Sequence, residues 1–128
     1  MAEPESKVAV VGPRRARDKA AVDEIRVPPH SVEAEQAVLG ALMLDNRAWD
    51  TIADRLVADD FYRRDHQLIF EAIAELAGRG EPSDAVTLSE WLERKGSSEQ
   101  TGGLVYLAGL VRDTPSAANV RAYADAVR

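Results

Sequence analysis

The 128-residue chain has few of the side chains on which most catalytic and binding sites depend. It has no cysteine, which excludes disulfides, thiolate zinc sites and cysteine nucleophiles. It has only two histidines, too few for a histidine-rich metal centre. Two Trp, three Tyr and two Phe make a poor platform for stacking nucleic-acid bases. No apolar run approaches the roughly 20 residues that a membrane span needs, so no membrane role is expected.

A net positive charge is also missing. The formal charge is −6, and it is unevenly distributed along the chain. Residues 1–27 hold six basic and five acidic side chains, whereas residues 28–128 hold ten basic and seventeen acidic ones. Nonspecific nucleic-acid binding draws most of its affinity from neutralising phosphates with cations. The main part of the chain therefore has the wrong sign for gripping DNA.

The motifs of phosphate and nucleophile chemistry are absent as well. The chain contains neither GxxxxGK[ST] nor GxGxxG, and no serine sits in a nucleophile elbow. Gly102-Gly103 opens a predicted helix and could offer backbone amides to an anion, although a flexible helix entry is the simpler interpretation. The carboxylates fall mostly on polar helix faces. Composition therefore favours a protein-binding module over an enzyme, with no catalytic, cofactor-binding or metal-binding residue expected.

Residues 1–27 are predicted to be a disordered, mixed-charge tail. Their apolar patch Val8–Val11 is too short for a secretory signal and ends at the turn signal Gly12-Pro13. A basic cluster follows, made up of Arg14, Arg15, Arg17 and Lys19. A solvated arm is its simplest interpretation. Pro28-Pro29 then closes the tail with a stiff, extended step.

From Ser31 onward the apolar residues recur at helical spacing, and no long segment alternates with period two. The pattern predicts an all-α fold, a compact bundle of about six helices over residues 28–128. Ser31 is the expected N-cap of the first helix. Thr87 and Glu90 are expected to form a capping box. Residues 97–101 are expected to be a polar loop.

Several individual residues carry expectations about packing. Gly40 lies inside the first helical pattern, where close approach of a neighbouring helix would explain it. Trp49 and Trp91 fall on apolar stripes and are expected in the core. His30 is expected to face solvent. His66 is expected to be a polar residue at a helix end, packed near Tyr62.

Two apolar stripes near the C-terminus bear on interactions. Leu104, Leu107, Ala108 and Val111 follow helical spacing, and the part from Leu107 to Val111 is expected to be mostly core. Val120, Tyr123, Ala124 and Val127 start a last helix that the chain end cuts. A stripe with nothing after it to cover it is either satisfied in the core or a contact surface.

The residues from Pro28 to Asp45, PPHSVEAEQAVLGALMLD, resemble the opening of the N-terminal domain of the bacterial replicative DNA helicase (DnaB type). The similarity continues through residues 57–62 (VADDFY), 66–70 (HQLIF), 87–96 (TLSEWLERKG) and 102–107 (GGLVYL). It ends in residues 114–128, TPSAANVRAYADAVR. One departure is residues 97–101, SSEQT, where the family often carries a leucine and a β-branched apolar residue.

The resemblance implies that residues 28–128 form a helical collar domain and that the RecA-like domain binding ATP and magnesium is absent from this chain. It implies self-association into dimers within a hexameric ring, recruitment of primase and, as a further partner, a helicase loader. The full-length parent would unwind duplex DNA at the replication fork in the bacterial cytoplasm, holding DNA mainly through its missing C-terminal domain. This chain would then have no enzymatic activity of its own.

The final two helices are the expected self-association or primase surface. The candidate contact residues are Tyr106, Arg112, Arg121, Tyr123 and Val127. Three alternatives stay open at this point. The chain could be a self-standing helical adaptor of the replication machinery, a small DNA-binding protein using its basic arm at residues 14–19, or an enzyme with an unrecognised carboxylate site.

Overall fold

In the computed structural model of the chain, residues 31–128 are described; the predicted tail and His30 lie outside them. The described part is all-α and contains no strand, which confirms the predicted fold class. Its helices are α1 (Val32–Leu44), α2 (Ala48–Ile52), α3 (Arg64–Gly78), α4 (Ala85–Arg94), α5 (Ser98–Thr101), α6 (Gly103–Arg112) and α7 (Val120–Val127). A short 3₁₀ turn, η2 (Ala58–Asp60), lies between α2 and α3.

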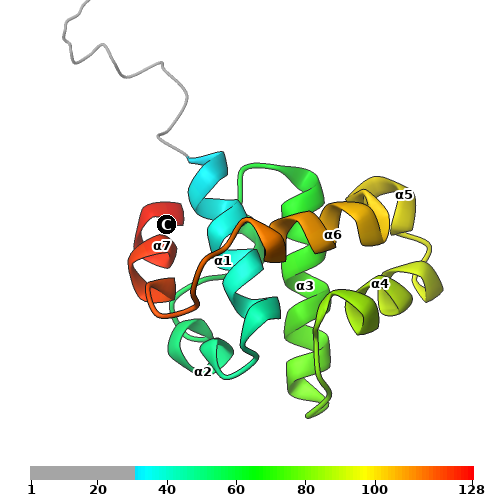
Figure 1. Ribbon diagram of the computed structural model, residues 1–128, viewed down its shortest axis with the longest axis horizontal. Coiled ribbons are helices and arrows are strands. Elements are labelled where there is room, and N and C mark those ends of the chain that lie inside the picture. The colour runs from blue at the N-terminus through cyan, green and yellow to red at the C-terminus, as the bar shows by residue number, and fades with distance from the viewer. Residues whose placement is uncertain (1–30) are drawn as a thin grey trace, which may run out of the picture.

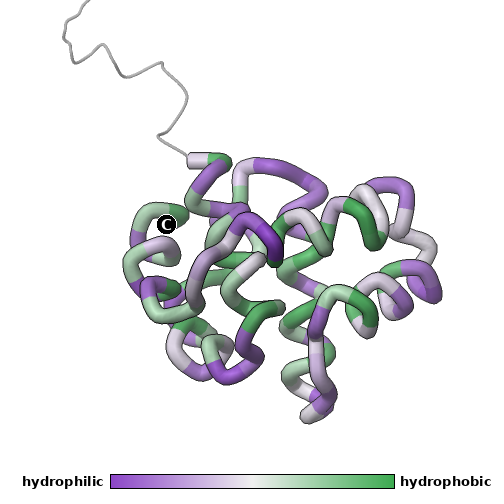
Figure 2. Tube along the Cα trace, viewed as in Figure 1, coloured by the Kyte–Doolittle hydropathy of each residue, from purple (hydrophilic) through white to green (hydrophobic). Residues whose placement is uncertain are grey.

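Helix α1 is the centre of the bundle, with α7 on one side and α3 and α6 on the other (Figure 1). Its residues Val38, Leu39, Ala41 and Leu42 are all completely buried. Figure 2 shows hydrophobic residues concentrated where α1, α3 and α6 meet, with hydrophilic ones at the outer turns. The Ser31 hydroxyl accepts a hydrogen bond from the Ala34 amide at 3.0 Å, which confirms the predicted N-cap.

Gly40 allows a close approach between α1 and the end of α6. A Cβ atom at this position would lie 2.0 Å from the Thr114 hydroxyl oxygen and 2.5 Å from the Leu110 carbonyl oxygen. Neither gap can hold a methyl group, because real Cβ atoms do not come within 3.0 Å of other heavy atoms. The prediction that close packing explains this glycine is confirmed, and the end of α6 lies directly on α1.

Aromatic side chains pack against one another in the core between α2, η2 and α3. The Phe70 ring lies 4.9 Å from that of Phe61 and 5.4 Å from that of Trp49, in tilted contacts. Trp91 is 8% exposed and Trp49 is partly buried against the core, so both tryptophans pack as the sequence predicted.

Two local predictions were wrong. Helix α4 begins at Ala85, because the Asp84 carboxylate accepts from the Thr87 amide at 2.9 Å and caps the helix one turn before the expected Thr87–Glu90 box. Residues 98–101 form the helical turn α5 and not a loop. The Thr101 hydroxyl is buried there and bonds the carbonyls of Ser97 and Ser98, which holds the turn together.

The expected exposure of the last two helices was also wrong in part. Val120, Ala124 and Val127 of α7 are buried, because α7 packs against α1 and α2. The α7 stripe is therefore satisfied within the core of this chain. In α6, Leu107 and Leu110 form the buried stripe, while Ala108, which was expected in the core, is exposed, as is Leu104.

Candidate protein-interaction surface

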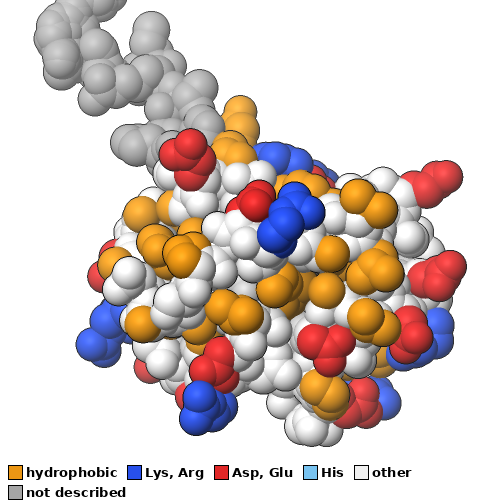
Figure 3. All heavy atoms as spheres, in the orientation of Figure 1, with side chains coloured by type: hydrophobic (Ala, Val, Ile, Leu, Met, Phe, Trp, Pro, Cys, Tyr) orange, Lys and Arg blue, Asp and Glu red, His pale blue; other side chains and the backbone are white. Residues whose placement is uncertain are grey.

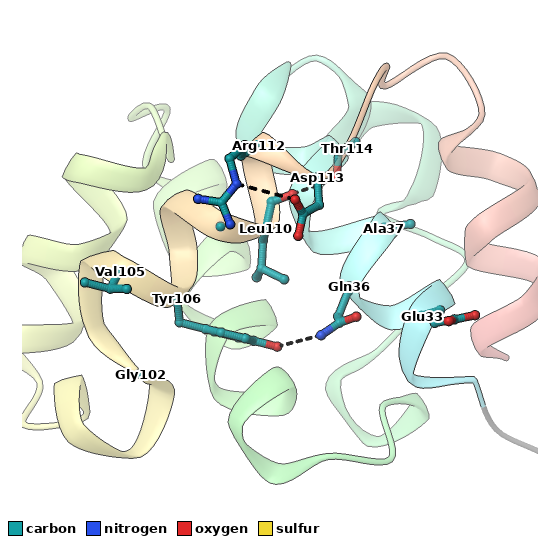
Figure 4. A pocket seen from close by; sticks show the side chains of 11 residues that line it. Glu33, Gln36, Ala37, Gly102, Val105, Tyr106, Leu110, Arg112, Asp113 and Thr114 are labelled. Atoms are coloured by element: carbon teal, nitrogen blue, oxygen red, sulfur yellow. Dashed lines mark hydrogen bonds and ion pairs between the residues drawn. The ribbon is translucent and has the colours of Figure 1, made fainter.

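A groove of about 490 Å³ runs between α1 and α6 and is the candidate site (Figure 4). Helix α1 supplies Glu33, Gln36 and Ala37 to its walls. Helix α6 and the residues that flank it supply Gly102, Val105, Tyr106, Gly109, Leu110, Arg112, Asp113 and Thr114. The Tyr106 ring points from α6 toward Gln36 and crosses the groove between Val105 and Glu33 (Figure 4).

Helix α6 carries exposed apolar residues at this groove. Val105, which lines the groove, is 86% exposed, and its neighbour Leu104 is 44% exposed. Hydrophobic side chains gather over α6 and α4 on the face that Figure 3 shows. The sequence contains a signal for this exposure, because Leu104, Val105, Tyr106 and Leu107 are four consecutive apolar residues. At 3.6 residues per turn such a run goes most of the way around the helix, so it cannot face the core as a whole.

A series of hydrogen-bonded polar side chains, called the polar chain below, holds the Tyr106 hydroxyl in place. Its hydroxyl lies 2.7 Å from His66 Nε2 and accepts a hydrogen bond from Gln36 Nε2 at 3.2 Å. His66 Nδ1 in turn lies 2.7 Å from Glu35 Oε1. His66 is 0% exposed and Glu35 is 1% exposed, so the polar chain joins α1, α3 and α6 through the interior.

The chemistry of the partners assigns the protons in this chain. A carboxylate only accepts hydrogen bonds, so Nδ1 of His66 carries the proton toward Glu35. The other ring nitrogen, Nε2, faces the Tyr106 hydroxyl. The second Glu35 oxygen, Oε2, accepts from the Tyr62 amide at 2.6 Å. Each buried polar atom named here therefore has a partner, as an interior polar group requires.

His66 lies in the first turn of α3, as predicted, but the sequence did not predict its partners. The ring points inward to Glu35 and Tyr106. These partners are 31 and 40 residues away in the chain. Helical periodicity reports only neighbours on the same helix, so the sequence held no signal for this contact.

An ion pair between Arg63 and Asp65 lies beside the polar chain. Arg63 forms a bidentate ion pair with Asp65, and its guanidinium lies 5.7 Å from the centre of the Tyr106 ring. Burial raises the pKa of Asp65, but the hydrogen bonds from Arg63 and the neighbouring charges outweigh it and leave that pKa below its usual range. The hydrogen bond to Asp65 raises the pKa of Arg63. Both groups are therefore held in their charged forms beside the groove.

Gly102 completes the groove wall. It has a φ of +83°, and a Cβ atom there would lie 2.6 Å from Tyr106 Cβ. Only glycine combines this left-handed conformation with such a close contact. The Gly102-Gly103 entry to α6 therefore makes room for Tyr106, which supports the structural interpretation of this pair over an anion site.

The five predicted contact residues lie in three different places. Tyr106 and Arg112 share the groove, where Arg112 pairs with Asp113 at 3.5 Å and its side chain stays 76% exposed. Arg121 is exposed beside a separate hollow between α2 and α7. Tyr123 is half-buried against the core, and Val127 is buried in it. The missed residues are Leu104, Val105 and Gln36.

Within residues 31–128, no group of three or more His, Asp or Glu side chains is placed to hold a metal ion. None of the helices described there has the length and apolarity that crossing a membrane requires. The fold and the groove thus define a small all-helical domain with an amphipathic surface groove on a rigid, internally hydrogen-bonded base.

The comparisons with known proteins give this domain a family. Residues 27–128 match the model of the DnaB-like helicase N terminal domain, and the chain belongs to that family. The chain is 50% identical over 105 residues to the replicative DNA helicase DnaB of Haemophilus influenzae, covering 82% of this chain and 22% of that protein. It is 48% identical over 99 residues to the protein of the same name from Geobacillus stearothermophilus, covering 77% and 22%.

A solved structure agrees. The N-terminal domain of DnaB helicase from Mycobacterium tuberculosis superposes with a TM-score of 0.76 at 44% identity, covering 79% of this chain and 70% of that one. The chain spans about a fifth of the length of the curated relatives it matches. The matched region is their N-terminal domain, as the sequence resemblance implied.

Proposed function

We propose that this chain is the assembly and protein-interaction domain of a bacterial replicative DNA helicase. In this role it supports dimer pairing within a hexameric ring and recruits primase, with a helicase loader as a further partner. The parent protein unwinds duplex DNA in the cytoplasm, using ATP and magnesium bound in a part outside this chain. Membership of the helicase N-terminal domain family supports this proposal.

The observation that carries the proposal is the apolar surface of α6 beside the groove. Val105 is 86% exposed and Leu104 is 44% exposed, whereas Leu107 and Leu110 of the same helix are buried. Exposed aliphatic side chains next to an aromatic ring and an arginine are typical of the centre of a protein interface. The groove therefore suits a partner helix with an apolar face.

Charge supports a protein partner over DNA at this surface. Residues 28–128 hold ten basic and seventeen acidic side chains. Arg112, the arginine of the groove, is already paired with Asp113. An acidic surface repels phosphates, so DNA contact by the parent is assigned to its other domain.

A binding measurement on a matched pair of variants tests the proposal. Val105→Asp places a charge in the groove wall, and Val57→Asp places one at an exposed valine outside it. With the helicase-binding domain of primase from the same organism as titrant, Val105→Asp is expected to weaken binding about tenfold or more. Val57→Asp is expected to bind like the parent sequence. Equal binding by both variants would overturn the role of the groove.

Sequencing the native gene past Arg128 tests the parent activity separately. A GxxxxGK[ST] segment downstream is the expected result, because a helicase needs a phosphate-binding loop. A stop codon near Arg128 would instead favour the self-standing helical adaptor.

A further inference from the structure

The chain that precedes the described fold enters it at the edge of the groove. Helix α1 begins at Val32, with Ser31 as its cap. Glu33, two residues further on, lines the groove (Figure 4). Any segment before Ser31 is therefore covalently tethered at the mouth of this site.

The groove combines apolar and acidic groups. Val105, Leu110 and Ala37 line it with aliphatic surface, of which Val105 is the most exposed. Glu33 and Asp113 add carboxylates to its walls, and the Arg112 guanidinium, which also lines the groove, pairs with Asp113 at 3.5 Å. A matching ligand would present a short aliphatic segment next to several cations.

The tethered segment has this composition. Val8–Val11 is aliphatic, and Arg14, Arg15, Arg17 and Lys19 follow it with Asp18 as the one acidic residue in between. The body of the chain has the opposite charge, with ten basic and seventeen acidic residues over 28–128. Ser31 comes 20 positions after Val11 in the sequence, and an extended chain of that length spans up to about 70 Å. The aliphatic segment can therefore reach any part of the groove.

We propose that residues 8–19 dock into the groove between α1 and α6 of their own chain. The aliphatic residues cover Val105, and the cations lie beside Glu33 and Asp113. A short tether gives an effective concentration in the order of millimolar, so even a weak affinity keeps the groove occupied. If the groove is also the partner site of the proposed function, this segment competes with the partner and regulates access to it.

The absence of cysteine makes a direct test simple. Val10→Cys in the full chain accepts a single nitroxide label. The label is expected to broaden the backbone amide signals of Val105, Gly109 and Arg112, while that of Gly80 stays sharp, because Gly80 follows α3 at the far end of the molecule (Figure 1). Equal broadening of all four signals, or of none, overturns the proposal.

Two controls assign the origin of the effect. Replacing Arg14, Arg15, Arg17 and Lys19 with glutamine should remove most of the broadening, whereas replacing Glu3 and Glu5 with glutamine should not. Mixing isotope-labelled chains that carry no nitroxide with nitroxide-labelled chains at natural isotopic abundance should leave the signals sharp. Broadening in the mixture would show docking onto a second copy and overturn docking in cis.

The measurements distinguish a failure of the proposed docking from a failure of the proposed function. The four-glutamine variant is also expected to bind the primase domain more tightly than the parent sequence. Broadening without this gain in affinity would leave the docking standing and contradict the shared partner site. Loss of broadening is a failure of the docking alone.

Discussion

Helices α6 and α7 look alike in sequence but differ in how the fold uses them. Both are short amphipathic helices that pack against α1. Helix α7 buries Val120, Ala124 and Val127 of its stripe and half-buries Tyr123, whereas α6 leaves Leu104 and Val105 exposed. The sequence left open whether the last stripe is core or contact surface, and the structure places most of it in the core. An apolar stripe shows that a helix has a partner, but not whether the partner lies within the same chain.

The largest expected effect separates the two helices by stability. Val127→Asp buries a carboxylate at a site that is 5% exposed, and it is expected to cost about 3 kcal/mol of unfolding free energy. Val105→Asp adds the same group at a site that is 86% exposed, and it should stay within about 0.5 kcal/mol of the parent sequence. Urea denaturation followed by circular dichroism measures both. A similar cost for the two variants would remove the distinction between the helices.

The contact between α6 and α1 is probed next by a pair of glycines. Gly40→Ala forces a methyl group against Thr114 and the Leu110 carbonyl, with an expected cost of about 2 to 3 kcal/mol. Gly78→Ala, at the end of α3, meets nothing within 4 Å and is expected to stabilise the fold by about 0.5 kcal/mol. Thermal melting of both variants checks the sign of each change. A neutral Gly40→Ala variant would contradict the close approach of α6.

A third pair compares one tyrosine from each helix. Tyr106→Phe leaves His66 Nε2 buried without its hydrogen-bond partner and is expected to cost about 1 to 2 kcal/mol. Tyr123→Phe on α7 removes a hydroxyl for which the described structure shows no hydrogen bond, so its cost should be within about 0.5 kcal/mol. Denaturant titration measures both costs. Equal costs would mean that the polar chain does not hold α6.

The smallest expected effect concerns pH. The pKa of Asp65 lies below its usual range in the folded chain, because the Arg63 hydrogen bonds outweigh the effect of burial. Its contribution to stability is therefore complete above the ordinary aspartate pKa of about 4 and is lost as the pH falls through the lower, folded value. The stability difference between the parent sequence and Asp65→Asn should shrink between neutral pH and pH 3.

The same pair can be checked by a double-mutant cycle with Arg63→Gln. Removing Arg63 first should abolish most of the effect of Asp65→Asn at neutral pH, since the two side chains act through one ion pair. Additive effects would contradict that coupling.

Periodicity predicted the all-α class and six of the seven α-helices in the described residues, because each depends on neighbours three or four positions away. Gly40 was also predicted, since a glycine inside a helix needs a packing reason. The polar chain was not predicted, because Glu35, His66 and Tyr106 come together only in the tertiary structure. The residues of the groove were predicted only in part. Tyr106 and Arg112 were among the predicted contacts, whereas Val105 was missed because it lies outside the apolar stripe of α6.

The central claim is that the surface of α6, and not that of α7, contacts the partner. Titrating the primase helicase-binding domain into Val105→Asp and Arg121→Glu variants tests it most directly, since both residues are exposed and lie on different helices. We expect binding about tenfold weaker for Val105→Asp and unchanged for Arg121→Glu. Unchanged binding for Val105→Asp together with weakened binding for Arg121→Glu would contradict the claim.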